Sequence, residues 1–290
     1  MTTNAFDRAA EDLGNIVNLG HVNHRVPDQR LATIFYMTGL GLTRDPAMMT
    51  GVENMWVNVG DSQFHLPTGP AVVAPGIVTG LVLPDLDALR ARLARVAPML
   101  EGSRFSCRHI DDAVESTCPW GNRIRCHAPD TARFGAMGLG MAYVSFEVAR
   151  GQANRIARFY REVFGALAMV EASDQGNEAR IVCGNGQRLL FEERAAPADP
   201  CVDHHIQIYV ANFSKPYRAL QEFGAKIEES NRYQYRIFSI LDIESGAPMF
   251  TLDHEVRSMT HPMYNRALVN RDAAQTARDY RTGRDYYFPA

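Results

Sequence analysis

The stretch that decides the fold is Asp203-His204-His205-Ile206-Gln207-Ile208-Tyr209-Val210. Because side chains alternate between the two faces of a β-strand, a strand here puts Ile206, Ile208 and Val210 on one face. The other face carries an imidazole, an amide and a phenol, from His205, Gln207 and Tyr209. Such a strand is typical of a sheet with a hydrophobic core on one side and a pocket on the other.

The same two-faced pattern occurs at earlier places in the chain. Residues 20–26 put His21, Asn23 and Arg25 opposite two valines, and residues 141–148 put Tyr143, Ser145 and Glu147 opposite four apolar side chains. Residues 77–83 keep the apolar strand but have no polar face. The sequence therefore predicts four related strands.

Each of these strands opens a repeated unit. A helical pattern follows each strand, and about three further strands follow the helix. Phe35-Tyr36 stands six residues before Gly41, and Phe159-Tyr160 stands six residues before Gly165. We therefore expect four units of strand, helix and three strands, arranged as two halves joined near residues 131–140.

Composition narrows the class of protein. The chain has 290 residues, is 46% apolar and 22% charged, and has a formal net charge of -3. These values are typical of a globular protein, and the absence of a Lys/Arg run argues against a nucleic-acid partner. The sequence has neither the apolar core of a signal peptide nor an apolar run of the ~18 residues that a membrane span needs. Five cysteines without a Cys-x-x-Cys pair favour reduced thiols in the cytoplasm.

The repeated units resemble the vicinal oxygen chelate superfamily, which includes glyoxalase I, bleomycin-resistance proteins and extradiol dioxygenases. The resemblance rests on the strand-helix-strand-strand-strand units, the His-Val-x-x-x-Val-x-Asp opening from His21 to Asp28, and the Phe-Tyr and Leu-Gly-Leu positions at the first helix end. It covers roughly residues 19–255. It implies an α+β fold in which four βαβββ modules pair into two cupped mixed-sheet domains.

We expect the domains to follow the two halves. Residues 15–130 would form the first domain from two modules, and residues 140–256 would form the second domain from the other two. Residues 257–290 would be a polar C-terminal extension that wraps the body or a second subunit, so a homodimer is one expectation.

The resemblance also implies metal-ligand positions on the first and last strands of the modules. In the second half these positions are Tyr143, His205 and Asp253, with Thr251 as the alternative register of the last strand. The extradiol dioxygenases have a histidine where this chain has Tyr143. We therefore take His205 and Asp253 as the first choice of metal ligands, and Tyr143, His205 and Asp253 as catalytic candidates.

The first half offers His21 and His65 as the second choice of ligands. Anionic side chains near the second-half imidazole favour a cation there, whereas arginines surround the first-half pair. We accordingly expect the metal site in the second half, with Gln207, Tyr209, Glu147 and Thr251 as substrate-binding residues.

Two functions remain open from the sequence. The first is an enzyme that acts on a small oxygenated, aromatic substrate, with iron, manganese or another divalent metal as cofactor. The alternative is a metal-free protein that binds and sequesters a small molecule, as bleomycin-resistance proteins do. No Walker or dinucleotide-type glycine loop follows a strand, so no nucleotide cofactor is expected.

Overall fold

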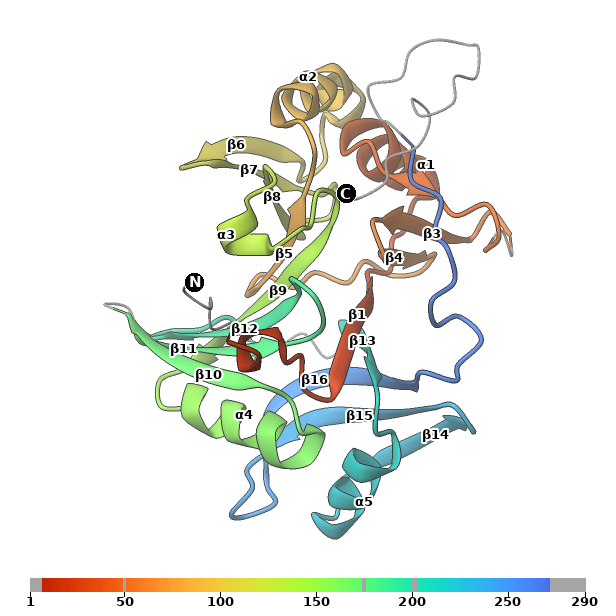
Figure 1. The fold of residues 1–290 in the computed structure, drawn as a ribbon. Coiled ribbons are helices and arrows are strands. Elements are labelled where there is room, and N and C mark those ends of the chain that lie inside the picture. Colours follow the sequence, from red (N-terminus) through yellow and green to blue (C-terminus); the bar gives the residue numbers. More distant parts are fainter. Residues whose placement is uncertain (1–6, 49–50, 174–175, 200–202, 272–290) are drawn as a thin grey trace, which may run out of the picture.

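Two eight-stranded mixed sheets form the body of the computed structural model (Figure 1), which describes residues 7–48, 51–173, 176–199 and 203–271. A short 3-10 turn, η1 (Ala9–Glu11), precedes the first strand. The predicted α+β fold with four βαβββ modules is confirmed.

The modules follow one another along the chain. The first contains β1 (Ile16–Asn23), α1 (Gln29–Ala32), the π-helical segment η2 (Thr33–Gly39), β2 (Thr43–Arg44), β3 (Asn54–Val59) and β4 (Ser62–Pro67). The second contains β5 (Ile77–Val82), α2 (Leu86–Val96), the 3-10 turn η3 (Ala97–Leu100), β6 (Ser106–Ile110), β7 (Ala113–Thr117) and β8 (Arg123–His127).

After the connecting helix α3 (Thr131–Phe134) the pattern repeats. The third module contains β9 (Gly140–Ala149), α4 (Ala153–Phe159), the π-helical segment η4 (Tyr160–Phe164), β10 (Ala168–Ser173), β11 (Gly176–Val182) and β12 (Arg188–Arg194). The fourth contains β13 (His205–Val210), α5 (Ser214–Glu222), β14 (Ile227–Asn231), β15 (Gln234–Leu241) and β16 (Pro248–Ser258).

The sheets join the outer two modules to each other and the inner two modules to each other. The first sheet has the order β14-β15-β16-β13-β1-β4-β3-β2 and so combines the first and fourth modules. The second sheet has the order β10-β11-β12-β9-β5-β8-β7-β6 and combines the second and third. In each sheet the two opening strands pair antiparallel at the centre, with Asn23 opposite His205 and Gly80 opposite Tyr143.

This pairing corrects the expectation that each half of the chain builds its own cupped sheet. Each of the four opening strands has an edge that can accept an antiparallel partner. Their alternation of apolar and polar side chains therefore does not specify which of them pair. The first and second modules instead contact each other through their helices, and so do the third and fourth. The segment α1–η2 lies beside α2, and α4–η4 lies beside α5 (Figure 1).

The π-helical segments place two tyrosines of the internal repeat in the core. Both Tyr36 and Tyr160 are fully buried, and each hydroxyl pairs with a buried imidazole. Tyr36 Oη lies 3.1 Å from His24 Nδ1, and Tyr160 Oη lies 2.7 Å from His254 Nε2. The repeated Phe-Tyr pair thus satisfies histidines on the core side of the sheet.

The C-terminal extension follows the first sheet after β16. Asn58 Nδ2 donates to Val269 O at 3.0 Å, the Gly60 amide donates to Asn270 Oδ1 at 3.0 Å, and Arg266 forms an ion pair with buried Asp45. The extension therefore lies against the body as far as residue 271. Residues 272–290 lie outside the described part.

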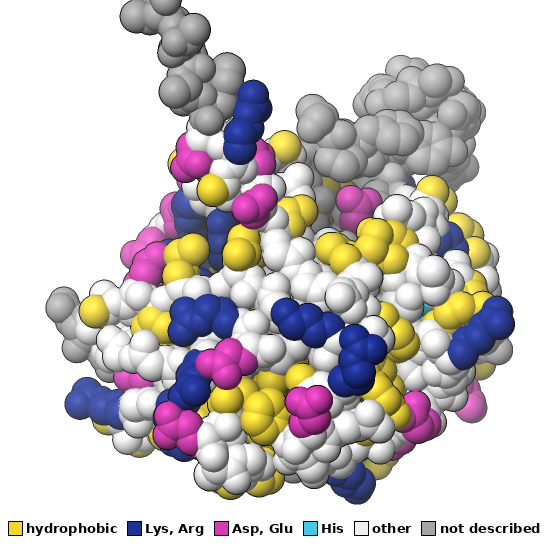
Figure 2. Space-filling model, turned by 60° about the horizontal axis from the view of Figure 1, so that its bottom comes forward, with side chains coloured by type: hydrophobic (Ala, Val, Ile, Leu, Met, Phe, Trp, Pro, Cys, Tyr) yellow, Lys and Arg dark blue, Asp and Glu magenta, His cyan; other side chains and the backbone are white. Residues whose placement is uncertain are grey.

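On the face shown in Figure 2, basic and acidic side chains are interspersed, so that face has no patch of one sign of charge. Among the described residues, no helix is long and apolar enough to cross a membrane.

Candidate metal centre

Three histidines from three strands converge in the cup of the first sheet. They are His21 on β1, His65 on β4 and His205 on β13, and one ligand atom from each lies within 4.8 Å of the others. His21 Nε2 and His205 Nε2 are 3.4 Å apart. Two nitrogens that bind one tetrahedral ion at about 2.0–2.1 Å stand roughly 3.3–3.4 Å apart. The spacing of this pair therefore fits a shared metal ion.

The protonation state of the imidazoles also fits, because a metal binds the neutral form. Burial, with Arg257 as the next cause, holds the pKa of His21 well below its usual value. Burial and nearby arginines lower the pKa of His65 to about 4, and burial and Arg236 lower that of His205 to about 2. All three rings are therefore neutral at pH 7.

The neighbours of His65 fix its tautomer. An amide nitrogen can only donate, so Asn23 Nδ2 donates to His65 Nδ1 at 2.9 Å. An amide oxygen can only accept, so His65 Nε2 donates to Asn54 Oδ1 at 2.7 Å. Trp56 stacks on the ring at a centroid distance of 4.0 Å. Nδ1 thus carries the lone pair, which accepts from Asn23 here and would exchange that hydrogen bond for a metal ion. Asn54 holds the ring as outer partners of metal-bound imidazoles do.

Two carboxylates on β16 lie beside the histidines. Glu255 Oε1 is 4.0 Å from His21 Nε2 and 2.6 Å from Arg257 Nη2. Asp253 is opposite His205 in the parallel pairing of β13 and β16, and Arg236 Nη2 lies 3.1 Å from its Oδ2. Burial raises the pKa of Asp253 to about 6, and among the described residues its Oδ1 has no hydrogen-bond partner. Asp253 can therefore gain or lose a proton near neutral pH.

A polar cavity of about 240 Å³ adjoins His21. Gln207, Tyr209 and Arg257 line it from the sheet, and Tyr264 lines it from the C-terminal extension. The rings of Tyr209 and Tyr264 are 4.9 Å apart. Gln207 is 1% exposed and its Nε2 has no partner among the described residues, so it offers an unused donor to a bound molecule.

The structure separates Tyr143 and Glu147 from this site. Both lie on β9, in the second sheet, where Tyr143 Oη is 3.0 Å from His127 Nε2. Placing Tyr143 with His205 was wrong, because it assumed that the third and fourth modules share a sheet. Thr251 is half-buried on β16, two residues before Asp253, and does not line the cavity.

The expectation that the second half alone holds the metal site is also not met by this geometry. The cluster combines His205, from the first choice of ligands, with His21 and His65, from the second choice. Asn23, Asn54 and Arg236 were not predicted as site residues from the sequence. Asn23 could have been found, because it shares the polar face of β1 with His21. Asn54 and Arg236 are neighbours of the cluster only because of how the strands pair.

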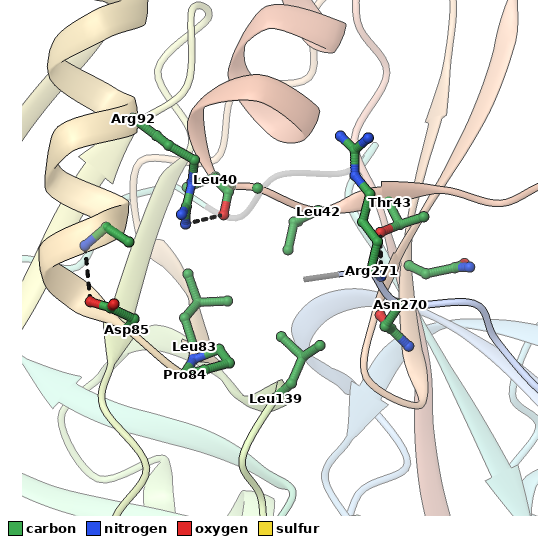
Figure 3. Close-up of a pocket in the computed structure, with 13 residues that line it drawn as sticks. Leu40, Leu42, Thr43, Leu83, Pro84, Asp85, Arg92, Leu139, Asn270 and Arg271 are labelled. Carbon is green, nitrogen blue, oxygen red and sulfur yellow. Dashed lines mark hydrogen bonds between the residues drawn. The ribbon is translucent and has the colours of Figure 1, made fainter. Parts of the chain in front are cut away.

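Another cavity, of about 210 Å³, lies between α2, the end of η2 and the C-terminal extension (Figure 3). Leu40, Leu42, Leu83 and Leu139 form its walls, and Arg92 reaches across to donate to Leu40 O at 3.2 Å. Its lining residues include a single carboxylate, Asp85, which caps α2, so they form no ligand cluster.

Comparisons with solved structures agree with this architecture. Glyoxalase I from Zea mays has a TM-score of 0.57 at 13% identity, covering 84% of this chain and 92% of that chain. A protein of Bacillus subtilis subsp. subtilis str. 168 with a provisional dioxygenase assignment has a TM-score of 0.56 at 13% identity, covering 87% and 88%. No protein-family model and no curated protein matches the sequence. The module order, the paired sheets and these likenesses show that the chain has the fold of the vicinal oxygen chelate superfamily.

Proposed function

We propose that the chain is a divalent-metal-dependent enzyme that acts on a small oxygenated molecule in the cup of the first sheet. The observation that supports this most strongly is the convergence of three neutral imidazoles from His21, His65 and His205. Catalytic metal sites commonly use three protein ligands and leave a position open for water or substrate. The histidine set matches that number, and iron and manganese both remain candidates.

When bound, the metal would polarise substrate oxygens and stabilise negative charge on them. The chain's own residues would transfer protons and orient the substrate. Asp253 Oδ1 would accept or return a proton, since its pKa of about 6 suits proton transfer near neutral pH. Arg236 holds the other oxygen, Oδ2, and so fixes the direction in which Oδ1 points.

Substrate orientation falls to the residues that line the cavity. Gln207 Nε2 is a buried donor without a partner, and Arg257 is a buried cation held by Glu255. The rings of Tyr209 and Tyr264, tilted by 60° to each other, give one wall an aromatic surface. These groups suit a small substrate that combines a ring with oxygen substituents.

The test is a titration of chelator-treated protein with Co²⁺, read by calorimetry and by the visible absorption of the bound ion. We expect one site per chain, lost in His21→Ala and in His205→Ala. His109→Ala serves as a matched control, because His109 is an exposed imidazole on β6. Equal cobalt binding by His205→Ala and His109→Ala would contradict the proposal.

A metal-free binding protein is the second candidate. It is favoured by the arginines in the cup, since Arg236 and Arg257 already pair with Asp253 and Glu255, the acids that would compensate a dication. In that case cobalt would not bind, and affinity for a small molecule would be the same with and without chelator.

A further inference from the structure

The second sheet forms a cup of its own, which the proposed function does not use. Its cavity is about 300 Å³, lined by β5, β8, β9 and β12 with Arg133 of α3 and Glu178 of β11. A well-formed cavity with convergent polar groups is the usual form of a small-molecule site.

The strand pairings show what replaces the histidines in this cup. His21 and His65 lie on the opening and closing strands of the first module, where His21 pairs with Gln63 and Asn23 with His65. In the second module Val78 pairs with Arg123 and Gly80 with Arg125. Val78 and Arg125 therefore correspond to His21 and His65. By the same comparison of the central pairs, Tyr143 corresponds to His205. The second cup thus has a valine, a guanidinium and a phenol where the first has three imidazoles.

A buried carboxylate holds Arg125 in place. Glu115 on β7 is 2% exposed, and its Oε2 accepts from Arg125 Nε at 3.1 Å and from Nη2 at 2.8 Å. Its other oxygen accepts from Arg108 Nη2 at 2.6 Å. Arg125 is therefore preorganised in the cavity wall, so little side-chain entropy is lost when it binds a ligand.

A chain of hydrogen bonds sets the direction of the Tyr143 hydroxyl. A guanidinium can only donate, so Arg133 Nη2 donates to His127 Nδ1 at 3.4 Å. With the pKa of His127 lowered to about 4 by burial, the ring is neutral and its proton is on Nε2. Nε2 then donates to Tyr143 Oη, 3.0 Å away. The proton of the Tyr143 hydroxyl is left free to point into the cavity.

The acidic side chains of the cup already have partners. Glu192 pairs with Arg194 and accepts from Ser145, Glu178 pairs with Arg180, and Glu147 accepts from the Ala198 amide at 3.2 Å with Arg123 3.7 Å away. The recognition groups that face the cavity are therefore the donors of Arg123 and Arg125 on β8 and of Tyr143 on β9.

We infer that the second cup is a metal-independent site for a small carboxylate, which Arg125 and the Tyr143 hydroxyl bind together. A guanidinium and a hydroxyl donor directed at one point form charge-assisted hydrogen bonds with a carboxylate, and these are stronger than bonds between neutral groups. The chain would thus carry two different ligand sites, one in each sheet.

Calorimetry on the full chain in EDTA tests this inference, with benzoate, benzamide and benzylamine as probes of nearly equal shape. We expect benzoate alone to bind. Tyr143→Phe should weaken benzoate binding about tenfold, because it removes one hydrogen bond to a charged group. Tyr209→Phe, the same substitution in the first cup, should leave it unchanged. Arg125→Gln should abolish binding, and Arg108 would still pair with Glu115 in that variant.

Three results would overturn the inference. The first is no binding of benzoate, and the second is equal binding of benzoate and benzamide. The third is loss of binding in Tyr209→Phe but not in Tyr143→Phe, which would place benzoate in the first cup. Because EDTA removes any bound metal, none of these results depends on the metal centre.

Discussion

His205 and Tyr143 show how far single residues can be interpreted from sequence. Alternation along a strand assigned His205 to the pocket side, and this placement is correct, whereas the core position of His254 beside Tyr160 is known from the structure. Tyr143 was assigned to the correct face but to the wrong site, since a face says nothing about which strand lies beside it. Local sequence determines the face of the sheet on which a side chain lies. Its neighbours on the adjacent strands depend on which strands pair, and local sequence does not determine that.

The buried core histidines predict how stability depends on pH. Burial lowers the folded-state pKa of His24 and of His254 to about 4, against about 6.5 in the unfolded chain. The unfolded chain therefore binds more protons between these values, and the free energy of unfolding falls as pH drops from about 6.5 towards 4. Each such imidazole adds up to about 1.4 kcal/mol per pH unit to that slope.

Urea unfolding at a series of pH values measures the slope. In His254→Gln, a neutral side chain that can still bond to Tyr160, we expect a shallower loss of stability below pH ~6.5 than in the parent. An unchanged slope would mean that His254 is not held neutral by burial.

At the scale of elements, the internal repeat could be predicted and the edge strands could not. The Phe-Tyr pairs fixed the helix ends, where both modules contain a π-helical segment. In contrast β6 (Ser106–Ile110) and β14 (Ile227–Asn231) are almost wholly exposed, so they lack the alternation of apolar and polar side chains that signals a strand.

The central strand β1 also depends on one glycine. A Cβ at Gly20 would lie 2.0 Å from Gln207 Oε1 and 2.9 Å from Tyr209 Cε2, because these side chains cross β1 to reach the first cup. Gly20→Ala should therefore displace Gln207 and destabilise the fold by about 1–3 kcal/mol.

A double variant separates this overlap from a general effect of alanine in the strand. Gly20→Ala combined with Gln207→Ala should recover most of the lost stability in urea unfolding, since the nearest overlap is gone. Additive losses in the double variant would show that Gln207 does not lie across Gly20.

At the scale of the whole molecule, the partner of each module decides where the chemistry lies. The sequence predicted four modules and the fold of their superfamily, but not that β1 pairs with β13 and β5 with β9. Pairing of the third module with the fourth would have placed His205 with Tyr143. The observed pairing places it with His21 and His65, which are 184 and 140 positions away in the sequence. A single sequence carries no record of such long-range contacts.

Anomalous diffraction from crystals of the full chain soaked in Mn²⁺ tests the central claim most directly. The account predicts one strong anomalous peak in the first cup, within bonding distance of His21, His65 and His205, and none in the second cup beside Tyr143 and Arg125. A peak in the second cup, or soaked crystals with no peak at the three histidines, would contradict a metal centre built from the first and fourth modules.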